Sequence, residues 1–332
     1  METKPFGWTQ QAVAVIGQGT WHMGESRRTR AAERAALTLG LELGLLHIDT
    51  AELYGGGGAE EMIGEVLHGS DRSRIFLTSK VMPQNASYRG TIAAAERSLQ
   101  RLSTDYLDLY LLHWPGRHPI EETMRAMEEL VAAGKVRFIG VSNFDVDELE
   151  AAMRALTRQR IASNQVLYNL ATRGIERELI PFCERAGIAV VGYTPFGNWP
   201  RSGSQGSRVL AAIGARHERT PRQVALRFLT RAPALFAIPK AVDAAHVRDN
   251  AGSVGFELDA ADLAALDRAF PVPRRAVPLA TAYPNCSEIP YAFPLLAGEG
   301  GRTWCAMQQM HLCRHLLTYE LGDGATAVRG PP

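Results

Sequence analysis

The stretch that decides the fold runs from Tyr106 to Asn143 and reads YLDLYLLHWPGRHPIEETMRAMEELVAAGKVRFIGVSN. Its two ends, YLDLYLLH and VRFIGVSN, are nearly continuous apolar runs, which is typical of parallel strands buried on both faces. Between them, apolar residues recur at three- and four-residue spacing over 124–131, after Pro119 and before a capping glycine, Gly134. The stretch therefore predicts one strand–helix–strand unit.

Similar units extend on both sides of this stretch. The further strand candidates are LLHID (45–49), IFLTSK (75–80), SNQVLYN (163–169), AVVGYTPF (189–196) and LFAIPK (235–240), and AVAVIGQGTW (12–21) suits an N-terminal hairpin followed by a first strand. Eight strand–helix units predict an α/β fold of the (β/α)8 TIM-barrel class with a short N-terminal β-hairpin. The rival, a doubly wound open sheet, normally has fewer strands and a second domain.

Composition excludes several classes of protein. The chain has 332 residues, 36 Lys+Arg against 35 Asp+Glu, a formal charge of +1 and 46% hydrophobic residues. This balance gives no basic field for nucleic acid or an anionic membrane. No secretory signal and no apolar run of membrane-spanning length is apparent, and four scattered cysteines make no disulfide framework. We therefore expect a soluble cytoplasmic protein that binds neither nucleic acid nor membranes.

The last part of the chain follows a different pattern. Residues 276–332 begin with a stretch rich in proline, glycine and aromatic residues, and TWCAMQQMHLCRHLLTYEL is compatible with a short helix over 303–320. We therefore predict two parts, a barrel over 1–275 and a mostly irregular C-terminal extension over 276–332. The extension could be a lid over the barrel mouth, a regulatory segment, or sequence not under selection for folding.

Polar residues stand at the ends of the predicted strands. Asp49 ends the second strand, Lys80 the third and His113 the fourth, and Tyr54 follows five residues after Asp49. Because the carboxyl ends of barrel strands meet at one mouth, we expect these four side chains to lie together.

Such a cluster suits proton transfer coupled to hydride transfer. A buried Lys80 paired with Asp49 would favour the phenolate of Tyr54 and lower a pKa that is ordinarily about 10. Tyr54 could then protonate a carbonyl oxygen, and His113 could hydrogen-bond and orient the same oxygen. Hydrolysis fits less well, since no serine or cysteine nucleophile accompanies the cluster.

Several motifs, in order along residues 10–275, carry a resemblance to a known family. They are GQGTWHMG (17–24), HIDTAELYG (47–55), SK (79–80), LLHWP (111–115), GVSNF (140–144), NQVLYN (164–169), GYTPF (192–196) and IPK (238–240). Together they resemble the aldo-keto reductases, in particular the bacterial methylglyoxal and 2,5-diketo-gluconate reductase-like branch.

The resemblance implies a monomeric barrel that uses NADPH to reduce small aldehydes and ketones, with 2-oxoaldehydes such as methylglyoxal as candidate substrates. It implies a catalytic tetrad of Asp49, Tyr54, Lys80 and His113, with Tyr54 as general acid. The implied cofactor contacts are Gly19, Thr20, Trp21, Asp49, Ser142, Asn143, Gln165, Tyr193, Thr194, Phe196, Asn198, Lys240, Ala241, His246, Asp249 and Asn250. Within this set, Tyr193 would stack on the nicotinamide and Lys240 would pair with the 2′-phosphate.

The implied substrate contacts are Trp21, Tyr54, His113 and Trp114. Trp199 is a further candidate, for which packing within its loop is the alternative.

Two residues depart from the family pattern at the phosphate end of the cofactor. His246 stands where an arginine is frequent, and Ala241 stands where a serine usually follows the lysine. An imidazole is usually neutral near pH 7 and lacks the bidentate fork of a guanidinium. We therefore expect NADPH to be the cofactor, with NADH as a weaker alternative.

Other sequence features have simpler interpretations. The glycine run 55–58 lacks the lysine and hydroxyl of a P-loop and favours a turn before a helix. GQGTWHMG has His22 where a dinucleotide-binding fingerprint needs its third glycine. Cysteines and histidines over 305–315 lack the spacing of a zinc site, so no metal is expected. Two alternative functions remain, a non-catalytic NADP(H)-binding regulatory module on the same barrel and a metal-dependent hydrolase or isomerase.

Overall fold

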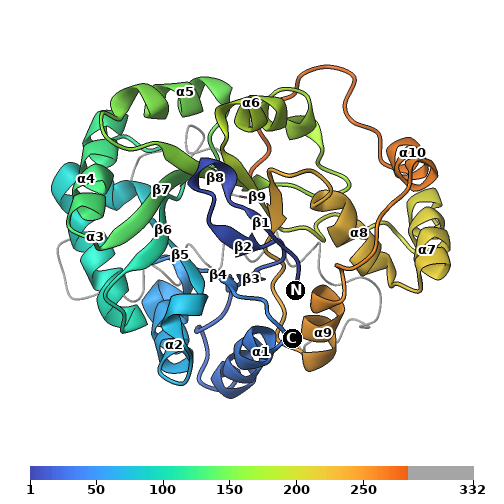
Figure 1. Cartoon of the computed structure of the whole chain (residues 1–332), viewed down its shortest axis with the longest axis horizontal. Helices are drawn as coiled ribbons and strands as arrows, with labels where there is room; N and C mark the ends of the chain where they lie inside the picture. Colours follow the sequence, from blue (N-terminus) through green and yellow to red (C-terminus); the bar gives the residue numbers. More distant parts are fainter. Residues whose placement is uncertain (283–332) are drawn as a thin grey trace, which may run out of the picture. The chain divides into compact units, whose positions relative to one another are not determined.

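The computed structural model describes residues 1–282 of the chain. Their centre is a sheet of eight parallel strands in the order β10-β9-β8-β7-β6-β5-β4-β3, surrounded by helices (Figure 1). The strands are β3 (Gln18–Gly19), β4 (His47–Asp49), β5 (Phe76–Val81), β6 (Leu107–Leu112), β7 (Val136–Ser142), β8 (Ile161–Leu167), β9 (Ala189–Tyr193) and β10 (Leu235–Ala237).

A helix follows each strand, and one connection holds two. The α-helices are α1 (Arg30–Glu42), α2 (Gly58–Leu67), α3 (Tyr88–Leu102), α4 (Ile120–Ala132), α5 (Val146–Ala155), α6 (Leu179–Ala186), α7 (Gln205–His217), α8 (Pro221–Leu229), α9 (Ala244–Ala251) and α10 (Ala260–Ala269). Short 3-10 helices are η1 (Gly7–Thr9), η2 (Tyr54–Gly57), η3 (Arg72–Arg74), η4 (Pro83–Asn85) and η5 (Gly174–Glu176). Helix α4 occupies the segment that opened the sequence analysis, and Glu121 and Glu122 in its first turn complement the helix dipole.

The first and last strands meet and close the sheet. Ile16 and Ala237 form a parallel bridge, the Gly17 amide donates to the Ala237 carbonyl at 2.8 Å, and the Ala237 amide donates to the Val15 carbonyl at 3.0 Å. Closure removes the unpaired edges that an open sheet would leave. The predicted (β/α)8 barrel is confirmed.

The predicted N-terminal hairpin closes the lower end of the barrel. Strands β1 (Thr3–Pro5) and β2 (Ala12–Ala14) pair antiparallel, and the Phe6 ring between them is fully buried. Its centroid lies 4.9 Å from the ring of Phe76 and 5.0 Å from that of Phe236, inside the barrel. Gly7 follows with φ +56, and a Cβ there would lie 2.4 Å from the Gly187 carbonyl oxygen, so the turn requires glycine.

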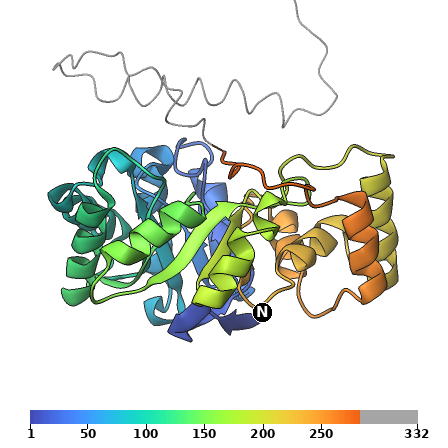
Figure 2. The same ribbon diagram turned by 90° about the horizontal axis from the view of Figure 1, so that it is seen from above.

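The segment after α10 lies at the opposite end from the hairpin. Figure 2 shows the dark blue hairpin at the lower edge and the orange segment at the upper edge. Residues Met1–Thr281 form one compact unit. The predicted boundary at 275 stays a prediction, and the predicted helix over 303–320 lies outside the described residues. Within residues 1–282, no helix combines the length and apolarity that crossing a membrane requires.

Candidate active site

Three neighbouring strands place Asp49, Lys80 and His113 of the predicted tetrad. Asp49 on β4 pairs with Thr78 on β5, and Lys80 lies two residues further along β5. Residues two apart on a strand share a face, so Lys80 points to the same side of the sheet as Thr78, the residue paired with Asp49. His113 comes directly after β6, where its amide donates to the Val81 carbonyl at 3.0 Å. The four predicted residues meet at the carboxyl ends of the strands.

Lys80 is the centre of the hydrogen-bond network at this point. Its Nζ donates to Asp49 Oδ1 at 2.6 Å, to the Thr50 carbonyl at 2.9 Å and to the Tyr54 hydroxyl at 3.2 Å. The Tyr54 ring meets the His113 ring edge to face, with centroids 5.7 Å apart. Tyr54 is 8% exposed whereas Lys80 is 0% exposed, so a substrate would reach the phenol and not the ammonium.

Burial controls the charges of this cluster. It lowers the pKa of the Lys80 ammonium and raises that of the Asp49 carboxyl, and each shift is opposed by the other charge of the pair. Burial, assisted by the charge of Lys80, lowers the pKa of His113 well below its ordinary value. His113 is therefore neutral at physiological pH. Its neutral ring keeps one N–H, which can hydrogen-bond and orient a carbonyl oxygen, but it has no imidazolium proton to transfer as an acid.

A glycine-rich turn positions Tyr54. Residues 55–57 all have positive φ values and form the 3-10 turn η2, after which α2 begins at Gly58. This is the turn predicted for the glycine run. Gly24, from the loop after β3, packs so closely that a Cβ on it would lie 2.3 Å from the carbonyl carbon of Gly58. The two loops thus hold each other in place beside Tyr54.

The predicted nicotinamide contacts lie next to the tetrad and are hydrogen-bonded to one another. The Tyr193 hydroxyl, at the end of β9, donates to Asn143 Oδ1 at 2.8 Å. Asn143 Nδ2 in turn donates to the His113 carbonyl at 3.0 Å and to Ser142 Oγ at 3.1 Å. This chain joins the ends of three strands around the predicted ring site.

Gln165 on β8 makes a contact that the sequence did not predict. Its Nε2 donates to Asp49 Oδ2 at 2.7 Å, so both carboxylate oxygens of Asp49 accept a hydrogen bond. Thr50 was also missed, although its carbonyl accepts from Lys80, because backbone acceptors leave no signal in residue types. The sequence offered one indication of these contacts: Thr50 directly follows the second predicted strand, and Gln165 lies within a predicted strand.

The remaining predicted cofactor residues lie along the same mouth, in three groups. Thr194, Phe196 and Asn198 belong to the loop after β9, where Thr194 and Asn198 have left-handed backbones. Lys240 and Ala241 follow β10, and His246, Asp249 and Asn250 belong to α9. Lys240 and His246 are exposed, and Asn250 is buried. The Asp249 carboxylate accepts a hydrogen bond from Thr220 Oγ1 at 2.8 Å, which ties α9 to the start of α8.

The predicted residues at the end of the first strand form hydrogen bonds with the two strands on either side of it. The Gly19 amide donates to the Pro239 carbonyl at 3.1 Å, and Thr20 Oγ1 donates to the Asp49 carbonyl at 2.9 Å. Trp21 stacks on His22 with ring centroids 4.2 Å apart, and Trp114 lies 4.7 Å from the ring of His113. Trp199, in contrast, packs edge-on against Phe196 in its own loop.

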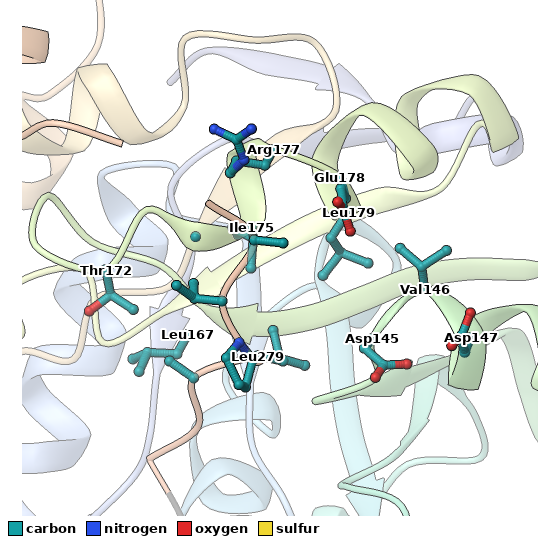
Figure 3. A pocket seen from close by; sticks show the side chains of 15 residues that line it. Asp145, Val146, Asp147, Leu167, Thr172, Ile175, Arg177, Glu178, Leu179 and Leu279 are labelled. Atoms are coloured by element: carbon teal, nitrogen blue, oxygen red, sulfur yellow. The ribbon is translucent and has the colours of Figure 1, made fainter. Parts of the chain in front are cut away.

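A separate cavity of about 230 Å³ is shown with its lining side chains in Figure 3. Its lining comes from the start of α5, from the end of β8 through the following loop to the start of α6, and from the segment after α10. It includes Asp145, Val146, Leu167, Ile175, Arg177, Leu179 and Leu279. None of the tetrad residues lines it. The cavity shows that residues 276–280 pack against the loop after β8.

In residues 1–282, no three His, Cys, Asp or Glu side chains gather to hold a metal ion.

Comparison with known proteins assigns the family. The model of the aldo/keto reductase family matches residues 15–270. The chain is 46% identical over 265 residues to methylglyoxal reductase YeaE of Escherichia coli (strain K12), covering 79% of this chain and 93% of that protein. It is 34% identical over 258 residues to glyoxal reductase of Bacillus subtilis (strain 168), covering 76% and 87%.

A solved structure agrees with these sequence matches. The crystal structure of an aldo-keto reductase from Klebsiella pneumoniae in complex with NADPH has a TM-score of 0.80 and 43% identity, covering 85% of this chain and 99% of that chain. The chain belongs to the aldo/keto reductase family.

Proposed function

We propose that this protein is an NADPH-dependent reductase of small aldehydes and ketones, with 2-oxoaldehydes such as methylglyoxal as substrates. One observation carries the proposal: the Lys80 ammonium lies between the Asp49 carboxylate and the Tyr54 hydroxyl, at 2.6 and 3.2 Å. The names of the methylglyoxal and glyoxal reductases among its relatives support the substrate class.

The residues of the mouth fit the cofactor. Gln165 uses its Nε2 on Asp49, while its Oε1 accepts no hydrogen bond from residues 1–282 and is available to a carboxamide N–H. Ser142 and Asn143 add further polar atoms beside Tyr193, and Lys240 offers an exposed ammonium for phosphate. When bound, NADPH supplies the hydride that reduces the carbonyl carbon of the substrate.

The residues of the protein supply the proton that the carbonyl oxygen needs. Tyr54 donates its hydroxyl proton to the carbonyl oxygen, and the phenolate that remains is stabilised by Lys80, whose own charge is balanced by Asp49. The neutral His113 hydrogen-bonds the same oxygen and fixes its direction. Asp49 is held in place by Gln165, so the ammonium stays between its two partners through the reaction.

Tyr54→Phe tests this mechanism, because it removes the hydroxyl and keeps the ring. NADPH oxidation with methylglyoxal should fall by about 10²- to 10⁴-fold, the usual contribution of an acid–base residue, while NADPH binding is retained. A rate above about a tenth of the wild-type rate contradicts the role of Tyr54. A wild-type protein that binds NADPH but consumes none with any carbonyl compound supports the regulatory module instead. Activity that a chelator abolishes supports the metal enzyme.

The protein is proposed to be a monomer in the cytoplasm. Within residues 1–282, the exposed large hydrophobic residues are Met1, Met153 and Val277, and three such side chains are few for the apolar surface of an obligate interface. Light scattering of the purified chain measures its mass in solution and so checks that it is a monomer.

The proposed boundary between barrel and extension is checked by comparing the stability of chains that end at Arg275 and at Ala282. Only the second chain keeps residues 276–280, which line the cavity.

A further inference from the structure

Arg222 is an exposed arginine whose side chain is held by aromatic rings. It belongs to the first turn of α8, and its guanidinium carbon lies 4.7 Å from the centroid of Phe196 and 5.4 Å from that of Trp199. The two rings pack edge to face, 5.8 Å apart. Stacking on aromatic faces fixes the plane of a guanidinium and leaves its N–H edge open to other groups.

No acidic group uses that edge. Among residues 1–282, the guanidinium of Arg222 forms no ion pair and no hydrogen bond, although many other arginines of the barrel are paired with carboxylates. A fixed, unpaired guanidinium is suited to a ligand with a phosphate group, which it can bind through two parallel hydrogen bonds. The aromatic contacts lower the entropy that ordering a free arginine would cost on binding.

Arg222 lies where the proposed cofactor site needs positive charge. Phe196 belongs to the loop after β9 that is proposed to follow the pyrophosphate. On the other side, Thr220 Oγ1 donates to Asp249 Oδ1 at 2.8 Å and Gln223 Nε2 donates to the Asp249 carbonyl at 3.0 Å. The start of α8 is thus tied to α9, the helix proposed to border the adenosine end of the cofactor.

Among the residues predicted to bind the adenosine end, only Lys240 and His246 are basic. Lys240 is exposed, and His246 on α9 is an imidazole, which lacks the bidentate fork of a guanidinium. A 2′-phosphate carries between one and two negative charges, and one exposed ammonium contributes little to binding it. We propose that Arg222 binds the 2′-phosphate of NADP(H) together with Lys240, and so makes the enzyme prefer NADPH over NADH. This inference rests on the proposed cofactor site.

Binding measurements test Arg222 separately from catalysis. Calorimetric titration with NADP+ and with NAD+ is carried out on the full-length wild type, Arg222→Met and Arg222→Lys. Arg222→Met should weaken NADP+ binding about tenfold or more and change NAD+ binding less than about twofold. Arg222→Lys should lie between the wild type and Arg222→Met, because it keeps the charge and loses the planar fork. Arg185→Met, at the opposite end of the barrel in the last turn of α6, is the matched loss of one exposed arginine and should bind like the wild type.

The NAD+ titration identifies indirect effects. If losing the stack only disturbed the loop around Phe196, or if Arg222 bound the pyrophosphate, both cofactors would bind more weakly by the same factor, and the inference would be wrong. Unchanged NADP+ binding in Arg222→Met also overturns it. A wild-type chain that binds no NADP+ refutes the proposed function itself, whereas a wild type that binds and a variant that binds equally refute only the role of Arg222.

Discussion

The Lys80 ammonium and the Asp49 carboxylate lie 2.6 Å apart, and both side chains are buried. Each charge loses its hydration on folding and recovers stabilisation mainly from the other. The pair also fixes the position of the ammonium against the Tyr54 hydroxyl. Stability and catalysis therefore depend on the same contact, and substitutions can separate the two.

Removing one partner should cost more stability than removing both. Lys80→Met leaves the Asp49 carboxylate buried without its cation and should lower the free energy of unfolding by about 3–5 kcal/mol. In Lys80→Met/Asp49→Asn no charge remains, and the Asn side chain can still accept from Gln165, so most of that stability should return. Reductase turnover should stay low in both variants, because Tyr54 has lost the ammonium. Urea unfolding and NADPH oxidation measure the two effects, and a double variant no more stable than the single one contradicts this account.

Glycines 24 and 56 should respond differently to the same substitution. Both have left-handed backbones, with φ of +73 and +62, so alanine costs about 1–2 kcal/mol at either position. A Cβ at Gly56 meets nothing within 4 Å, whereas one at Gly24 meets the backbone of Gly58 at 2.3 Å. Gly24→Ala should therefore displace the turn that carries Tyr54.

The difference is measured by thermal unfolding and turnover number. Gly56→Ala should keep a turnover number close to that of the wild type. Gly24→Ala should lose at least about tenfold and unfold at a lower temperature than Gly56→Ala, since overpacking adds roughly 1–3 kcal/mol to the backbone strain. Equal behaviour of the two variants would show that the contact between the two loops does not position Tyr54.

Tyr193 should contribute to cofactor binding mainly through its ring. Its hydroxyl donates to Asn143 Oδ1, but the proposed interaction with the nicotinamide is stacking. Tyr193→Phe keeps the ring and should change the NADPH dissociation constant less than about threefold. Tyr193→Ala should raise it about tenfold, since an aromatic pair contributes roughly 0.5–1.5 kcal/mol beyond the area that it buries. Fluorescence titration with NADPH distinguishes this from a dominant hydroxyl contact, for which both variants would bind equally weakly.

The fold and the tetrad could be predicted because both are encoded locally. Strand β6 is buried along its whole length, so its sequence is an apolar run interrupted only by Asp108, and the polar residue after it, His113, had to face the mouth. The boundary between β2 and β3 could not be predicted in the same way. The run from Ala12 to Gly19 is apolar except for Gln18, and residues 13–19 are all buried, because the hairpin and the first strand both pack against the barrel interior.

Contacts between distant segments were not predictable from residue types. Gln165 and Asp49 are 116 residues apart in sequence, and their hydrogen bond depends on the barrel closing around them. The stack of Arg222 on Phe196 and Trp199 likewise requires the start of α8 to reach the loop after β9. The neutral state of His113 follows from its burial beside Lys80, which no spacing in the sequence expresses.

His47 should make the stability of the protein depend on pH. It lies fully buried on β4 between the rings of Phe6 and Phe76, and burial, with a smaller effect of the Lys80 charge, lowers its pKa to about 3. The unfolded chain binds a proton at this residue near pH 6.5, so between about pH 3 and 6.5 the unfolded state holds more protons than the folded one. Stability therefore rises with pH across this window.

Lowering the pH from 7 to 5 should cost about 2 kcal/mol of unfolding free energy at His47 alone, since a pKa difference of one unit corresponds to about 1.4 kcal/mol. The lowered pKa of His113 acts in the same direction, and the raised pKa of Asp49 acts in the opposite one. His47→Gln removes the titrating group, so urea unfolding at pH 7 and 5 should show a smaller loss than in the wild type. His68→Gln, a change at an exposed histidine, should keep the wild-type loss. An unchanged loss in His47→Gln would mean that the pH dependence arises elsewhere in the protein.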